Sequence, residues 1–547
     1  MAARDAFAQT YSDELLGQYD CPDRLVFLAY NQYLQSGGGF RLFWRNLFGD
    51  DSRLTSEHIA DLAGAMVRRL TAYCAKHGVP ILDAAARDRK GDSAQAYIPA
   101  DPVFRGLFLV QKSLAPAPQW HVERHQQKGH IIKLYRLKKW AIVRHVFFHI
   151  MDPEWGHVTI RMCCHPPFGA MVILNGHDWV RRRAAERGLP FRTDGNCFIE
   201  GTDFCGIGAL GRQLAACPTG IRALADRWIY TACLSFGLST QEQQDTGFKY
   251  DYSAFQIEYS RNYIFRRGCV LDQIYQSLLD RTRRVLGLEQ LKTILGFKHR
   301  PHTRPVIAIT RSCNAQGVYD LTTLTVTWGA FQLKIYDKSA RLLRAEVTVN
   351  NAKALRCARS LDNIPAIMER LQVILQQFMD HVQALNVAFI GPDEPQRWSQ
   401  SGNVGDRRMA GLNLNNARIR TVLSLLPLLS TAPDGFSSAN LQERVRHHDG
   451  LEDYTIAQAR YDLQKLRGKG LVRRLPHRRR YHVTAQTARR VCAYFTLTDE
   501  VIRPLLAACA LRRPQRRQHR QQHPADALRL QLCDTLAQLF LELGIAA

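Results

Sequence analysis

GAFQLKIYDKSARLLRAEVTVNN (residues 329–351) alternates apolar and polar residues on both sides of a short turn. Alternation places successive side chains on opposite faces of a strand, so the stretch predicts a β-hairpin. If Tyr336 pairs with Arg344, then Lys334 falls opposite Glu346, and the apolar residues of both strands share one face. The other face carries Lys334, Tyr336, Lys338, Arg344 and Glu346. The hairpin therefore predicts a sheet whose polar face is either a solvated surface or a functional site.

Apolar-rich stretches on either side of this hairpin extend the prediction to a larger sheet. Strand patterns recur over residues 130–174 and from 306 onward, with helical patterns between them. The chain of 547 residues is long for one domain, so we expect a multi-domain α+β protein with a mixed or antiparallel sheet. The expected parts are an N-terminal α/β lobe (1–120), a central α+β body (121–390), a Pro/Gly/Ser-rich linker (391–411), a winged helix-turn-helix domain (412–511), and a basic linker with a last helix (512–547).

The charge of the chain indicates a polyanionic partner. The net charge is +25, and residues 455–523 hold 17 Lys/Arg against 3 Asp/Glu. A second run, 124–150, has 7 Lys/Arg and no acidic residue. Clustering of this kind is typical of proteins that bind the phosphates of nucleic acid. No apolar stretch approaches the 18 residues of a spanning helix, so we expect no membrane partner.

Cysteine usage predicts the compartment. The 14 cysteines form no C-x-x-C pair and no regular spacing, which fits reduced thiols in the cytoplasm better than a disulfide framework.

Residues 413–497 read as three helices followed by two short strands. Thr455 and Gln458 have the spacing of a capping box at the start of the third helix, whose residues Ala459, Leu463 and Leu466 face inward. This layout resembles the winged helix of MarR-like bacterial regulators. The resemblance implies that the third helix enters the major groove of DNA, while the strands contact the phosphate backbone. The base-reading candidates are Gln458, Tyr461, Gln464 and Lys465, and the phosphate-binding candidates are Arg473, Arg474, Arg478, Arg479 and Arg480. RNA or protein contacts are the alternative.

The stretch LNGHDWVRRR is a strand-to-helix turn with two interpretations. Its backbone N–H groups, with His177 and Arg181 nearby, could hold a phosphate. Alternatively, Asn175 simply caps a solvated helix. A second short motif, the glycines of CGIGALG at 206, 208 and 211, has the G-x-G-x-x-G spacing of a nucleotide site, but a turn is the preferred interpretation.

Four side chains within residues 145–165 are candidate metal ligands. His145, His149, Cys163 and His165 share one parity of a predicted hairpin. However, His145 and His149 lie about 13 Å apart at roughly 3.3 Å per strand residue, too far for one ion on an unbent strand. A sheet face turned toward phosphates explains the same residues, so we assign no metal ligand. Such polar faces would give the body a second nucleic-acid surface.

The string K-x-Y-D-K followed by L-R-x-E (residues 334–346) resembles a stretch of rolling-circle replication initiators. That resemblance implies a mobile-element or replication-type protein that nicks DNA through Tyr336, with Glu346 as metal ligand or base and Mg²⁺ or Mn²⁺ as cofactor. Lys334, Lys338 and Arg344 are the further catalytic candidates, since cations beside Tyr336 would favour its phenolate. Those enzymes hold a metal through an H-x-H strand, which this chain lacks. The chain as a whole also resembles a bacterial family that shares its N-G-H-x-W, E-Y and K-x-Y-D-K segments.

Two functions remain open from the sequence. One is DNA processing, which needs further carboxylates near Tyr336, and Glu258 and Asp320 are the candidates. The other is a non-enzymatic regulator or structured-RNA binder that uses the same surfaces for binding alone. The sequence favours DNA over RNA, and it leaves open whether the protein is a monomer or a homodimer.

Overall fold

The computed structural model of the chain describes residues 5–85, 90–125, 127, 129–137, 140–201, 203–285, 306–313, 320–386, 394–404, 407–432, 435–448, 450–476 and 479–503, with seven positions between 527 and 538. These residues belong to two compact units. The sheet unit comprises Tyr11–Asp272 and Thr303–Leu375, and the C-terminal unit comprises Ala2–Thr10, Gln273–His302 and Gln376–Ala547. No helix in the described ranges is long and apolar enough to cross a membrane.

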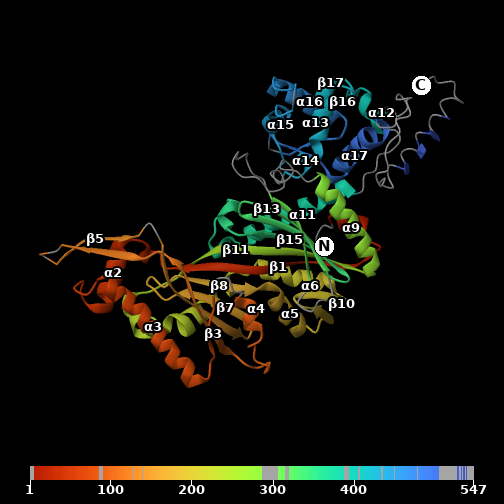
Figure 1. Cartoon of the computed structure of the whole chain (residues 1–547). Coiled ribbons are helices and arrows are strands. Elements are labelled where there is room, and N and C mark those ends of the chain that lie inside the picture. The colour runs from red at the N-terminus through yellow and green to blue at the C-terminus, as the bar shows by residue number, and fades with distance from the viewer. Residues whose placement is uncertain are drawn as a thin grey trace, which may run out of the picture. The chain divides into compact units, whose positions relative to one another are not determined.

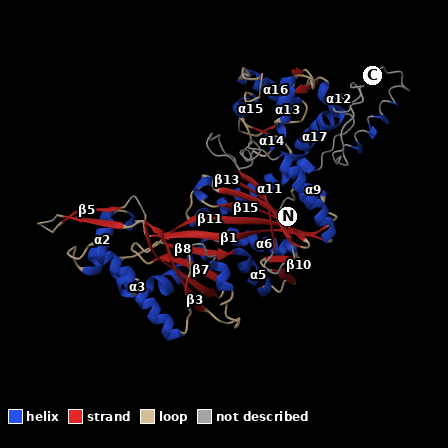
Figure 2. Cartoon of the chain, viewed as in Figure 1, coloured by secondary structure: helices blue, strands red, loops and turns tan. Residues whose placement is uncertain are grey.

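The sheet unit is built on one large mixed sheet (Figures 1 and 2). Its strand order is β12-β13-β14-β15-β11-β1-β8-β7-β6-β3-β2, and the β2–β3 pair is parallel. The strands are β1 (Leu15–Tyr30), β2 (Ile81–Asp83), β3 (Gly106–Ala117), β6 (Ala141–Asp152), β7 (Gly156–Cys163), β8 (Ala170–Asn175), β11 (Asp251–Phe265), β12 (Val306–Cys313), β13 (Asp320–Trp328), β14 (Phe331–Ser339) and β15 (Leu342–Val349). The predicted combination of helices with a large sheet is confirmed.

Helices and two small hairpins complete the sheet unit. The hairpins are β4 (Trp120–Arg124) with β5 (Ile131–Arg136), and β9 (Phe191–Asp194) with β10 (Cys197–Gly201). The helices are α2 (Gly37–Phe48), α3 (Ser56–His77), α4 (Lys90–Gln95), α5 (Gly176–Glu186), α6 (Phe204–Ala215), α7 (Pro218–Trp228) and α8 (Thr240–Thr246). Two more, α9 (Gly268–Val285) and α11 (Ile364–Asn386), continue from this unit into residues of the C-terminal unit.

The hairpin register predicted from the sequence is confirmed. Tyr336 pairs with Arg344, and Lys334 pairs with Glu346 across β14 and β15. The predicted apolar face is buried, with Leu333, Ile335 and Val347 at most 1% exposed. Alternation and turn length were sufficient here because register decides which face every side chain occupies.

The expected N-terminal lobe of residues 1–120 is not a unit of its own. Strands β1, β2 and β3 precede residue 120 but lie in the same sheet as the later strands. The prediction was wrong because β1 pairs with β11, whose residues are more than 200 positions away in sequence, and no local pattern signals that pairing.

Two glycines explain how closely helices approach β1. A Cβ at Gly176, the first residue of α5, would lie 2.0 Å from the Pro22 carbonyl oxygen. A Cβ at Gly211 of α6 would lie 2.4 Å from the Asp20 carbonyl oxygen. The CGIGALG glycines therefore lie in a helix that packs against a strand backbone, and neither the turn nor the nucleotide-site interpretation holds.

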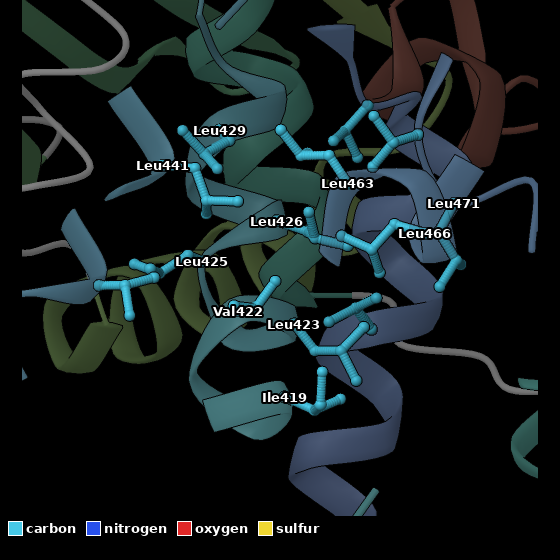
Figure 3. Close-up of a cluster of buried hydrophobic side chains, with 14 of the residues drawn as sticks. Ile419, Val422, Leu423, Leu425, Leu426, Leu429, Leu441, Leu463, Leu466 and Leu471 are labelled. Carbon is cyan, nitrogen blue, oxygen red and sulfur yellow. The ribbon is translucent and has the colours of Figure 1, made fainter. Parts of the chain in front are cut away.

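The C-terminal unit has a leucine-rich core of its own (Figure 3). Buried side chains converge from helices α13, α14, α15 and α16, including Ile419, Leu426, Leu441 and Leu463. The elements are α12 (Glu394–Ser399), β16 (Gly402–Val404), β17 (Arg407–Met409), α13 (Ala417–Ser424), α14 (Leu426–Ser430), α15 (Ser438–Val445), α16 (Ile456–Gly468), β18 (Arg473–Arg474), β19 (Tyr481–His482) and α17 (Ala485–Phe495).

The linker expected at 391–411 is wrong for its described part. Residues 394–399 form α12, and β16 pairs with β17. Trp398 is buried in the C-terminal core, and Lys469 donates a hydrogen bond to the Gln400 carbonyl oxygen. A single apolar side chain anchors this Pro/Gly-rich stretch, and composition alone did not reveal it.

Candidate functional site

The polar face of the hairpin forms a cluster with residues from β1, α5 and β11. The structure brings together side chains from segments far apart in sequence, here called the polar cluster: Asp23, His177, Glu258, Asn262, Lys334, Tyr336, Arg344 and Glu346. Four of these, His177, Glu258, Lys334 and Tyr336, lie in the N-G-H-x-W, E-Y and K-x-Y-D-K segments. Of the two alternatives for this face, the solvated surface does not hold, since Tyr336, Arg344 and Glu346 are all buried.

Arg344 is the centre of this cluster. Its Nη1 donates to Asp23 Oδ2 at 2.7 Å, and its Nε donates to Asn262 Oδ1 at 2.8 Å. Its Nη2 lies 2.9 Å from Cys197 Sγ and 3.2 Å from His177 Nε2. With every nitrogen engaged and 1% of the side chain exposed, Arg344 is held in place. All of its donor nitrogens bind protein groups in this conformation.

The same contacts fix the protonation of His177. Because His177 Nε2 accepts from Arg344, its proton lies on Nδ1, which donates to Asp23 Oδ1 at 3.1 Å. Burial lowers the pKa of His177, and Arg344 lowers it further against the opposing effect of Asp23. For Asp23, burial alone would raise the pKa, but Arg344 and then His177 hold it well below its ordinary value. The network is therefore a neutral histidine between a carboxylate and a guanidinium.

Glu346 accepts hydrogen bonds from two of the four other predicted catalytic residues, Lys334 and Tyr336. Lys334 Nζ donates to Glu346 Oε1 at 2.9 Å, and the Tyr336 hydroxyl donates to Oε2 at 3.0 Å. Burial raises the pKa of Tyr336 well above its ordinary value, and Glu346 raises it further. The expectation of a favoured phenolate is wrong, because the carboxylate and burial outweigh Arg344. Lys338 is exposed at the end of the hairpin.

Glu258 is the group of this cluster best placed to exchange a proton near neutrality. Burial raises its pKa to about 7, and the negative charges of Glu346 and Asp23 add to the effect. The sequence named Glu258 as a candidate carboxylate, and its pairing opposite Thr348 places it diagonally from Glu346. Asp320 begins β13, and its side chain lies outside the described part of the structure. Carboxylate oxygens of this pair suit Mg²⁺ or Mn²⁺ in type. Within the described residues, no three His, Cys, Asp or Glu side chains could hold a metal ion.

Sequence analysis missed Asp23, Asn262 and Cys197. Asp23 lies where the β1–β11 register shifts between Pro22 and Leu25, and Cys197 comes from the small hairpin β9–β10 that covers Arg344. The contacts of Asp23 and Cys197 with Arg344 depend on pairing between segments far apart in the sequence, so a single sequence offers no signal for them.

The turn before α5 follows the simpler of its two interpretations. Asn175 Oδ1 accepts hydrogen bonds from the backbone N–H groups of His177 and Asp178, so the N–H groups proposed for a phosphate are already engaged. His177 is 2% exposed and cannot reach a surface ligand. Arg181 is exposed and pairs with Asp178 at 3.0 Å.

The histidines of β6 do not face phosphates either. His145, His149 and His165 are all at most 6% exposed. His149 contacts His157 at 3.0 Å and Gln111 at 3.1 Å, inside the sheet unit. Burial lowers the pKa of His149 to about 3 and that of His145 to about 4, so neither carries a positive charge near neutral pH. Cys163 pairs with His145 across β6 and β7 and is buried. The phosphate-facing sheet proposed for these residues is wrong.

Helix α16 presents one apolar and one polar face. Ala459, Leu463 and Leu466 are at most 1% exposed, as predicted. The predicted capping box is present: Thr455 Oγ1 accepts from Gln458 N, and Gln458 Oε1 accepts from Thr455 N at 2.7 Å. Gln458 is thus partly engaged in capping. The outer candidates Tyr461 and Gln464 are exposed, and Lys465 is half-buried with its Nζ 4.8 Å from the centre of the Tyr461 ring.

The hairpin after α16 exposes most of its described arginines. Arg473, Arg474 and Arg479 are exposed. Arg480 is half-buried, and its Nη2 donates to the Gly435 carbonyl oxygen at 2.9 Å, which binds this strand to the loop before α15. The candidate Arg478 lies outside the described residues. A bridge between Phe436 and Tyr481 adds a third strand position to the β18–β19 pair.

Comparison with known proteins identifies no family. No protein-family model matches the sequence, and no curated protein matches it. A search of solved structures returned the rolling circle replication initiator protein from Geobacillus stearothermophilus, with 9% sequence identity and a TM-score of 0.21. The match covers 69% of this chain and 88% of that chain. A TM-score this low does not establish a shared fold.

Proposed function

We propose that the protein binds duplex DNA through residues 412–503, with α16 in the major groove and the β18–β19 hairpin against the phosphate backbone. The order of elements supports this: helices α13, α15 and α16 share one core, and a two-stranded hairpin follows directly. This is the arrangement expected of a winged helix.

The orientation of one carboxylate carries the proposal. Residues 455–482 contain nine Lys/Arg and a single acidic residue, Asp462. Asp462 is fully buried, accepts a hydrogen bond from the Tyr454 hydroxyl at 2.8 Å, and lies 3.4 Å from Arg418. The outer surface of this segment therefore presents cations without a carboxylate from the same segment. Such a surface attracts a polyanion and repels basic proteins.

The exposed side chains fall into two groups, one suited to phosphates and one suited to base edges. Arg473, Arg474 and Arg479 are placed for phosphates, because guanidinium groups bind phosphate oxygens in fork geometry. Tyr461 and Gln464 project from the exposed side of α16, and a glutamine amide can bond both adenine N6 and N7 in the major groove. Lys465, packed on the Tyr461 ring, adds a cation to the same side.

The experiment compares two paired substitutions in the full-length protein. Arg473→Ala with Arg474→Ala should weaken binding to a 30-base-pair duplex by about tenfold or more at low salt, because two phosphate contacts are lost. Arg53→Ala with Arg68→Ala removes the same charge from exposed positions of the sheet unit and should leave the affinity within about twofold. Equal losses in both pairs would show that only net charge matters and would refute the proposed interface.

Strand cleavage at the polar cluster is a second candidate function. It rests on the Tyr336–Glu346 hydrogen bond at 3.0 Å, which places a carboxylate to accept the phenol proton. The phenol oxygen would form a bond to a phosphorus atom as the P–O bond of the strand breaks, and the leaving oxygen would take up a proton. Because the phenolate is disfavoured in this state and Tyr336 is 9% exposed, the substrate would have to approach before the proton moves.

Incubation with supercoiled DNA and Mg²⁺ or Mn²⁺ tests this second function. Wild type should give nicked circles, and Tyr336→Phe should give none. Glu346→Gln should also abolish nicking, because it removes the proton acceptor. Nicking that survives in Tyr336→Phe would refute the tyrosine role, and intact circles with wild type would leave DNA binding as the function.

A further inference from the structure

The far side of the sheet unit from the hairpin carries an exposed apolar row on β3 and β6. Leu114 is 58% exposed, Ile142 63%, and Trp140, two residues before Ile142, 59%. Leu114 lies opposite Arg144 in the β3–β6 ladder, and Pro116 lies opposite Ile142. Since partners in a ladder share a face, these side chains form one surface. Three large apolar groups exposed side by side suggest a binding surface rather than chance.

A groove of about 700 Å³ runs beside this row. It is lined by Lys112, Leu114 and Arg144, with Val67 of α3 and the segment from Asp83 to Ala85. Strand β2 ends at Asp83, so its pairing with β3 stops at Lys112. The groove follows the part of β3 beyond that point.

The charge around this surface favours a polyanion. Lys112 and Arg144 line the groove, and Arg144 is exposed. Lys112 Nζ lies 3.4 Å from a carboxylate oxygen of Asp83, whose side chain is 85% exposed. Asp83 is the only acidic residue that lines the groove in the described residues, and it partly neutralises Lys112.

We propose that this surface binds single-stranded nucleic acid, with a base stacked on Trp140 and phosphates held by Arg144 and Lys112. An indole ring offers its face to any unpaired base, whereas bases in a duplex have no free face. Ile142 and Arg144 lie about 6.6 Å apart along β6, and Trp140 directly precedes this strand, so a stretched polynucleotide can follow the row. The expected second nucleic-acid surface therefore lies here and not on the buried polar faces. The proposal is independent of duplex binding by α16.

The test measures fluorescence anisotropy of a labelled 15-nucleotide oligo(dT) with the full-length protein. The background carries Arg473→Ala and Arg474→Ala, which reduces the contribution of the duplex interface. Trp140→Ala should raise Kd about tenfold through lost stacking. Arg144→Ala should lower the magnitude of the salt slope by about 0.7, the value for one phosphate of a single strand. Asp83→Asn should tighten binding, because it frees Lys112.

Tyr33→Ala is the matched control, since Tyr33 is an aromatic of the same unit that is 72% exposed. It should leave Kd unchanged. Oligo(rU) with the same dependence on Trp140 would extend the site to RNA and also support the proposal. The proposal is overturned if Trp140→Ala and Arg144→Ala bind oligo(dT) like their parent, or if a blunt duplex competes as well as oligo(dT).

Discussion

Replacing Glu258 by glutamine should stabilise the protein at alkaline pH and leave it unchanged at acid pH. The folded protein raises the pKa of this carboxyl from 4.5 to about 7 through burial and through the charges of Glu346 and Asp23. A raised carboxyl pKa means that the folded state binds the proton more tightly than the unfolded state. The contribution of Glu258 to the free energy of unfolding is therefore greatest below pH 4.5 and is lost as the pH rises through 7.

The size of the effect follows from the shift. A difference of 2.5 pKa units (7 − 4.5) corresponds to about 3.5 kcal/mol at most when each unit is worth about 1.4 kcal/mol, and partial exposure of Glu258 reduces it. At pH 8 the Glu258→Gln protein should thus unfold at a temperature higher by on the order of 5 °C. At pH 4 the two proteins should melt together.

The assay is thermal unfolding of wild type and Glu258→Gln between pH 4 and 9, followed by circular dichroism. Glu369→Gln, an exposed position in α11, is the control, and its difference from wild type should not vary with pH. A Glu258→Gln difference that is flat across this range would refute the assignment of a proton to Glu258 in the folded protein.

Three further substitutions test the packing that holds these sites. Asp23→Ala leaves the buried Arg344 uncompensated and should cost about 3–5 kcal/mol in urea unfolding, whereas Glu200→Ala, which breaks an exposed pair with Arg192, should cost under about 1 kcal/mol. Gly211→Ala brings a Cβ to 2.4 Å from a β1 carbonyl oxygen and should cost at least about 1–3 kcal/mol of stability. Gly38→Ala is the control, because the space around Gly38 is open, and it should not destabilise the protein. Similar melting of the two variants would contradict the close approach of α6 to β1. Thr455→Ala removes the capping box of α16 and should cost about 1 kcal/mol, and an unchanged midpoint would argue against that cap.

The sequence was informative where the deciding contacts are local. The β14–β15 register and the cap of α16 each depend on residues close in the chain. Alternation sets the first, and the spacing of Thr455 and Gln458 sets the second. The apolar face of α16 followed from helical periodicity in the same way.

Prediction from the sequence failed where a segment distant in the chain covers a surface. The sequence left the polar face of the hairpin open between a solvated surface and a functional site, whereas Asp23 of β1, His177 of α5 and Cys197 of β10 close over Arg344. Once these groups are in place, burial reverses the expected chemistry of Tyr336, whose pKa rises instead of falling. The phenolate prediction counted the nearby cations but not the desolvation that the fold imposes, nor the negative charge of Glu346.

The salt dependence of duplex binding tests directly whether the β18–β19 hairpin contacts DNA phosphates. For wild type and for Arg473→Ala/Arg474→Ala/Arg479→Ala, log K for a 30-base-pair duplex would be measured against log salt between 50 and 300 mM. Each phosphate contact contributes about 0.9 to the slope on B-DNA, so the triple variant should have a slope smaller in magnitude by about 2.7. An unchanged slope in the triple variant would contradict a DNA interface at the β18–β19 hairpin.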